Sequence, residues 1–96
     1  MRETLPTRWW FVADEHKAMF VEELLKEVGP GHALYGLDVD VTARRDGSDD
    51  YLFHIADGRY ADVHLTFRGA PEPPPWPATA VYATFEEWKK ACADDE

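Results

Sequence analysis

Histidine and aspartate side chains in the middle of the chain are the residues best suited to chemistry. His54 and His64 lie in two segments where apolar and polar residues alternate, and Asp62 lies two residues before His64. Two imidazoles and a carboxylate can bind a divalent metal ion or act together as an acid and a base. This is because histidine titrates near neutral pH and a carboxylate can orient its ring. Asp38 or Asp40, from the preceding alternating segment, could join them.

The same residues also fit a polar sheet face with no catalytic role. Histidine and aspartate are ordinary cross-strand neighbours on a face that meets water or a partner protein. The sequence has no ligand spacing such as His-x-x-x-His, and we expect neither a metal ion nor a cofactor. His54, His64 and Asp62 are therefore candidates for acid–base catalysis, with a solvated sheet face as the simpler interpretation.

His32 is a further candidate, in a glycine-rich stretch just after a predicted helix. Its ring could bond free carbonyl groups at the helix end or hold the turn in place, and it could equally be a site residue presented on a loop. Tyr35, three residues later, could line a pocket or belong to the core.

Arg44-Arg45 and Asp49-Asp50 flank one predicted turn. Cross-strand ion pairing is the simpler account, worth under about 1 kcal/mol if the groups are exposed. A basic pair can also bind a phosphate, but no glycine loop that would cradle one accompanies it. Arg44 is kept as a candidate binding residue, and Tyr60 and Trp76 are candidates because exposed aromatic residues anchor partner proteins.

Composition and charge exclude several classes of protein. With 96 residues, of which 45% are hydrophobic, the chain has apolar material for one core and is not disordered. The net charge of −9 argues against nucleic acid and anionic membranes as partners. The sequence has no run of 18 apolar residues, and we see no secretory signal in it. The single cysteine, Cys92, has no internal partner and lies in an acidic tail that disfavours a thiolate. We expect a cytoplasmic protein.

Hydrophobic periodicity predicts two helices and a sheet. One helix is expected over residues 15–28 and a second over 84–93, where Thr84 and Glu87 have the spacing of a capping box. Strands are expected over 37–45, 51–56 and 60–67, with a short fourth strand at 81–82, and residues 8–13 fit an edge strand or a helical turn. Pro71–Pro77 should be an extended connector.

This order predicts an α+β domain. Its antiparallel meander of three to four strands should carry the N-terminal and C-terminal helices on one face. We expect residues 1–96 to form one domain, with residues 1–13 not firmly assigned and residues 94–96 frayed.

The register of the second hairpin decides which side chains share a face. A two-residue turn at Asp57-Gly58 would place Phe53 on the same face as Asp62 and His64, because a slip of one residue reverses every side chain of a strand. Burial of large apolar side chains, at roughly 1.5–3 kcal/mol each, should outweigh that turn. We therefore predict a three-residue loop or a bulge, with Gly58 at positive φ and both histidines facing away from Phe53.

Several motifs together resemble a small bacterial family of uncharacterised proteins. They are Gly31-His32-Ala33-Leu34-Tyr35-Gly36, Ala43-Arg44-Arg45, Asp49-Asp50-Tyr51-Leu52-Phe53, Val63-His64-Leu65-Thr66-Phe67 and Trp76-Pro77. The resemblance covers roughly residues 20–88 and implies a compact, cytoplasmic bacterial domain. It implies no activity and no ligand.

Two functions from different classes fit these observations. The first is a small acidic binding module, immunity- or antitoxin-like in size and charge, whose outer sheet face binds a basic protein. The second is a small hydrolase- or isomerase-like enzyme built on His54, His64 and Asp62, with His32 as a further member. A homodimer formed through the same face would also explain the pattern.

Overall fold

The computed structural model of the protein describes residues 5–71, 73 and 76–94. Its elements along the chain are β1 (Trp9–Phe11), α1 (Asp14–Glu27), β2 (Val39–Arg45), β3 (Asp50–Ile55), β4 (Tyr60–His64), β5 (Thr79–Tyr82) and α2 (Phe85–Asp94). In the proline-rich connector, residues 72, 74 and 75 lie outside the described residues, as do residues 95–96 of the expected frayed tail. No helix in the described ranges is long and apolar enough to cross a membrane.

The five strands form one antiparallel sheet in chain order, β1-β2-β3-β4-β5. The α+β class and the antiparallel meander are therefore confirmed. The expected count of three to four strands was too low, because the ambiguous segment near Trp9 is a fifth, edge strand. The short fourth strand expected at 81–82 is β5, which is two residues longer.

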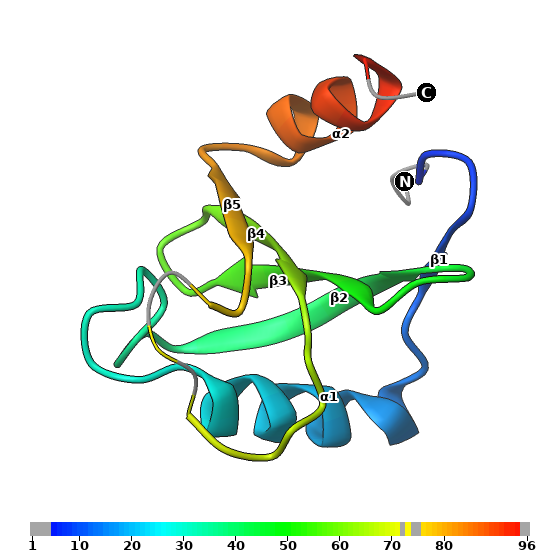
Figure 1. Ribbon diagram of the computed structural model, residues 1–96. Coiled ribbons are helices and arrows are strands. Elements are labelled where there is room, and N and C mark those ends of the chain that lie inside the picture. The colour runs from blue at the N-terminus through cyan, green and yellow to red at the C-terminus, as the bar shows by residue number, and fades with distance from the viewer. Residues whose placement is uncertain (1–4, 72, 74–75, 95–96) are drawn as a thin grey trace.

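The placement of both helices on one face of the sheet was wrong. The sheet lies between α1 and α2, which cover opposite faces (Figure 1). The reason lies in β3, where Tyr51, Phe53 and Ile55 are buried on the α1 side while Leu52, with its side chain pointing the other way, is buried on the α2 side. A strand that is apolar on both sides needs a cover on both sides.

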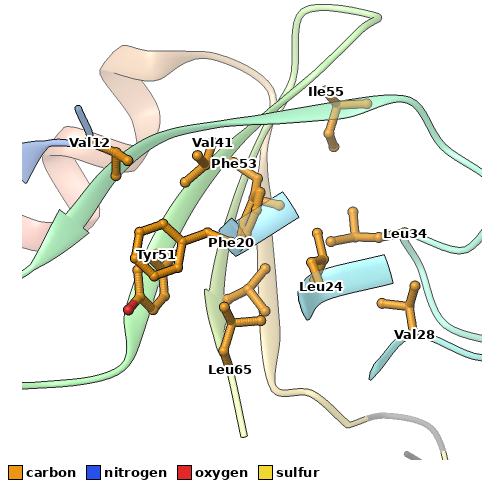
Figure 2. Close-up of a cluster of buried hydrophobic side chains, with 12 residues drawn as sticks. Val12, Phe20, Leu24, Val28, Leu34, Val41, Tyr51, Phe53, Ile55 and Leu65 are labelled. Carbon is orange, nitrogen blue, oxygen red and sulfur yellow. The ribbon is translucent and has the colours of Figure 1, made fainter. Parts of the chain in front are cut away.

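The larger core lies between α1 and the sheet. Phe20, Leu24 and Val28 recur at helical spacing and face the strands, as Figure 2 shows. The Phe20 and Tyr51 rings pack with centroids 4.5 Å apart. The core also includes Val12, Leu34, Val41, Phe53, Ile55, Ala61, Val63 and Leu65.

A smaller, aromatic core lies between α2 and the other face. Trp88 of α2 is fully buried and meets Trp9 edge-to-face at 4.9 Å. Phe85, Leu52 and Ala43 complete this core. One half of the predicted capping box forms at the start of α2, where the Glu87 N–H donates to the Thr84 hydroxyl at 3.1 Å. The Glu87 carboxylate accepts the N–H of Ala83 at 3.2 Å instead of that of Thr84.

A bulge in β2 changes which side chains face which helix. The pairing with β3 shifts between Val41 and Ala43, so one extra residue, Thr42, stands in β2. Simple alternation places Ala43 beside Val41, but the bulge turns Ala43 toward α2. Arg44 then faces α1, with its guanidinium 6.0 Å from the Phe20 ring centroid.

The predicted register of the second hairpin is confirmed. Phe53 pairs with Ala61, and the Ile55 N–H donates to the Arg59 carbonyl at 2.8 Å. The loop is the three residues 56–58, and Gly58 has a φ of +99°. Burial of the apolar face therefore selected the longer loop.

Candidate functional site

The two strand histidines share the α2 face of the sheet but are not neighbours. His54 pairs with Tyr60, and His64 pairs with Asp50. The pair Leu52–Asp62 lies between these two pairs. At about 3.3 Å per residue, the histidines are roughly 13 Å apart along the hairpin. The structure thus places His54, His64 and Asp62 on one face but does not bring them together as one acid–base set.

Asp62 holds α2 on the sheet. Its Oδ2 accepts a hydrogen bond from Nε1 of the buried Trp88 at 3.0 Å. A buried indole N–H needs such a partner, so the carboxylate that we considered for catalysis has a structural role.

His54 lies exposed at the end of β3. Its ring stacks on Tyr60 with centroids 4.8 Å apart, and its backbone partner on β2 is Asp40. Tyr60 is half-buried and meets Phe85 of α2 edge-to-face at 5.6 Å. Tyr60 is therefore less accessible to a partner than the exposed aromatic anchor that we expected from the sequence.

His64 is oriented by Asp50, which the sequence analysis treated only as an ion-pair partner. The His64 Nδ1 and Asp50 Oδ1 atoms lie 2.9 Å apart. The Ser48 hydroxyl donates to Asp50 Oδ2 at 2.8 Å, and Arg45 Nη1 lies 3.9 Å from the same oxygen. The signal that could have found this pair is the hairpin register, which sets Asp50 directly opposite His64.

His32 is buried and ties two distant segments together. Its Nδ1 accepts the Leu34 N–H at 3.0 Å, which leaves the ring proton on Nε2, and Nε2 donates to the Pro77 carbonyl at 3.0 Å. The Thr79 hydroxyl donates to the same carbonyl at 2.9 Å. His32 therefore holds the turn after α1 against the start of β5, one of the two roles expected for it.

The remaining candidates lie on different surfaces. Arg44 is exposed on the α1 face, over the rings of Phe20 and Tyr51. Tyr35 and Trp76 are 54% and 51% exposed on the two segments that His32 joins. Both are accessible to a partner, but neither lines the two hollows on or beside the α2 face.

Two hollows on or beside the α2 face are the candidate sites. The first, which we name the α2 pocket, has a volume of about 580 Å³ and lies at the end of the sheet where β2 meets β3. The second, the β2 edge depression, has a volume of about 340 Å³ and lies where β1 ends. The pocket is lined by Thr7, Arg8, Trp9, Arg45, Asp50, Asp62 and Cys92, and the depression by Phe11, Val12, Asp14, Lys17, Asp40, Val41, Thr42 and His54.

The β2 edge depression lies beside a strand edge with which no described strand pairs. β1 pairs only with Ala43–Arg45, and in the described part of the chain no strand lies beside residues 39–41 on that side. The Ala56 N–H donates to the Asp38 carbonyl, so Asp38 and Asp40 turn their backbone groups toward β3. Val41 faces the open side, where its N–H donates to Asp40 Oδ1 at 2.9 Å.

A buried carboxyl group on the α1 side escaped the sequence analysis. Glu27 is fully buried, and its two oxygens accept the N–H groups of Thr66 at 2.8 Å and Phe67 at 2.9 Å. Burial raises the pKa of Glu27, a hydrogen bond with Glu23 raises it further, and the two amide donors oppose this. Its position three residues after the buried Leu24 was the available signal.

Among the residues whose placement is described, no three His, Cys, Asp or Glu side chains come close enough together to hold a metal ion. No protein-family model, curated protein or solved structure matches this chain. The family resemblance noted from the motifs therefore stays a prediction, and the function has to be argued from the geometry.

Proposed function

We propose that the protein is a small acidic binding module that holds an extended, basic segment of a partner protein against the β2 edge depression. The observation that carries this proposal is the edge of β2 at Val39–Val41, with which no described strand pairs and which is flanked by exposed acidic side chains. An immunity- or antitoxin-like role is one form that such a module takes.

The strand edge supplies the main-chain part of the interaction. An uncovered edge offers N–H and C=O groups with which an incoming strand can pair. Here the Val41 N–H donates to Asp40 Oδ1 and Val41 is only 1% exposed, so the Asp40 side chain has to move aside before an incoming strand can pair with this residue. Phe11, 37% exposed at one wall of the depression, offers an apolar contact to a side chain of the incoming strand.

The charges around the depression favour a basic partner. Lys17 is paired with Asp14 at 3.1 Å, and Arg59 with Asp57 at 2.8 Å. Asp38 and Asp40 are exposed and form no ion pair among the described residues. The net charge of −9 would also speed the approach of a basic partner.

A peptide titration tests the proposal. Two synthetic peptides, one alternating Lys with Val and the other alternating Glu with Val, are added to ¹⁵N-labelled protein. The Lys peptide should shift the amide signals of Phe11, Val41, Thr42 and His54, and the Glu peptide should not. Asp40→Asn should weaken binding about tenfold, as expected for loss of one charged partner.

Asp46→Asn is the matched control, because it removes the same charge from the exposed β2–β3 turn at the other end of the sheet. If both variants weaken binding equally, the attraction is a property of the whole protein and the site is wrong. Shifts centred elsewhere, or equal shifts with the Glu peptide, would refute the proposal.

The enzyme alternative is supported by the Asp50–His64 pair. A carboxylate on Nδ1 orients an imidazole so that its Nε2 can exchange protons, which is the geometry of a general base. His54 and Asp62 do not contribute, since one stacks on Tyr60 and the other binds Trp88. Loss of a measured activity in His64→Gln but not in His54→Gln would favour this alternative.

A further inference from the structure

The α2 pocket is a second hollow, separate from the β2 edge depression. The two hollows share no lining residue. The volume of the pocket, about 580 Å³, lies in the range of roughly 300–1,000 Å³ that is typical of small-molecule sites. Trp9, which is 8% exposed, contributes a small apolar surface to one wall, and Cys92 lines the pocket from α2.

The strand order separates the charges in this pocket by sign. Arg8 immediately precedes β1 and Arg45 ends β2, whereas Asp50 begins β3 and Asp62 lies in β4. Because the strands are in the order β1-β2-β3-β4, the two cations lie on one side and the two carboxylates on the other. Neighbouring strands are about 4.8 Å apart, so the two sides are a few ångströms from each other at the centre of the pocket.

The polar groups of this pocket retain bonding capacity. Arg8 forms no ion pair within the described ranges, and the Arg45–Asp50 contact of 3.9 Å is long. A guanidinium has five donors, and a carboxylate can accept more than the two hydrogen bonds seen at Asp50. A ligand can therefore bond to the arginines and to Asp50 without displacing the hydrogen bonds that hold Asp50.

Arg8 is held beside the pocket in an unfavourable backbone conformation. Its φ is +74°, a region that costs a residue with a side chain roughly 1–2 kcal/mol. The Asp46 N–H donates to the Arg8 carbonyl at 2.6 Å, and the Trp9 N–H donates to the Pro6 carbonyl at 3.1 Å. Backbone strain of this kind concentrates at binding sites, where the surrounding structure keeps a functional residue in place.

We propose that the α2 pocket binds a small zwitterion of the amino-acid class. The carboxylate of the ligand would bind Arg8 and Arg45, the ammonium group would face Asp50 and Asp62, and the side chain would lie against Trp9. A simple anion would be repelled by the two carboxylates, and a simple cation by the two arginines. A ligand with both charges matches both sides of the pocket.

Amide spectra of ¹⁵N-labelled protein test this proposal. Each standard L-amino acid is added in turn up to about 10 mM, with acetate and methylamine as probes that carry one charge only. At least one amino acid should give saturable shifts at Arg8, Arg45 and Cys92, and each single-charge probe should bind about tenfold more weakly. No saturable shift, or acetate binding as tightly as the best amino acid, would overturn the proposal.

Variants locate the binding. Arg8→Gln and Arg45→Gln should each weaken it about tenfold. Arg68→Gln, an exposed arginine on the segment that Glu27 holds, should not change it. Equal weakening by all three variants, with unfolding midpoints matching the wild type, would place the ligand elsewhere. Asp40→Asn should leave amino-acid binding intact, so this result does not depend on the proposed peptide site.

Discussion

The buried carboxyl group of Glu27 should determine how strongly the chain segment after β4 is held against α1. Glu27 accepts the backbone N–H groups of Thr66 and Phe67 at 2.8 and 2.9 Å. Replacing it with Ala leaves both partly buried donors without an acceptor, at about 1–2 kcal/mol each. Glu27→Ala should therefore lower the free energy of unfolding by about 2–4 kcal/mol. Glu27→Gln, which keeps one acceptor, should lower it by about half as much.

The pH dependence of stability gives a second measure of the same group. The pKa of Glu27 is raised above its ordinary 4.5 because burial and the hydrogen bond with Glu23 favour the protonated form. The folded protein therefore holds this proton more tightly than the unfolded chain does. The resulting stabilisation is fully present below pH 4.5 and is lost as the pH rises through the raised pKa.

Urea unfolding at a series of pH values, followed by tryptophan fluorescence, measures both effects. The stability of the wild type relative to Glu27→Gln should fall as the pH rises from 4.5, because the variant has no proton to lose at this position. Glu22→Gln is the matched control, since Glu22 is exposed on the same helix. If Glu27→Gln and Glu22→Gln behave alike in magnitude and in pH dependence, the reasoning is refuted.

Two further substitutions test the sheet and its second core. Leu52→Ala should cost about 2–5 kcal/mol in urea unfolding, because Leu52 is fully buried under α2; a cost below about 1 kcal/mol would contradict the packing of α2 on this face. Gly58→Ala should cost about 1–2 kcal/mol, since a Cβ there has nothing within 4 Å and only the φ of +99° opposes it. Gly58→Asn should recover part of that loss, because asparagine tolerates positive φ better, and an unchanged unfolding midpoint in Gly58→Ala would show that the loop does not need this conformation.

Local patterns in the sequence were sufficient to predict the class of the fold and the register of its second hairpin. The alternation around Phe53 and Val63 required one apolar face, and burial of that face required a three-residue loop ending at Gly58. The same alternation placed His54, His64 and Asp62 together on the other face. These predictions succeeded because a strand's period of two and the cost of exposing large apolar side chains act over a few neighbouring residues.

The layers and the sites depended on contacts between residues distant in the chain. Only the packed structure shows that Leu52 needs a second cover, that α2 supplies it through Trp88, and that Asp62 is used to hold that indole. The bulge at Thr42 likewise turns the side chains of Ala43 and Arg44 to the faces opposite to those that simple alternation predicts.

Which charged groups meet was decided by the same long-range packing. Alternation gives the face of a side chain but not its position along that face. His64 therefore met Asp50, while His54 lay four residue pairs away along the hairpin. The two hollows exist because β1 is shorter than β2 and because α2 crosses the sheet without covering all of it. Strand length and helix placement depend on the total apolar surface that the whole domain buries. A local sequence pattern does not determine that total.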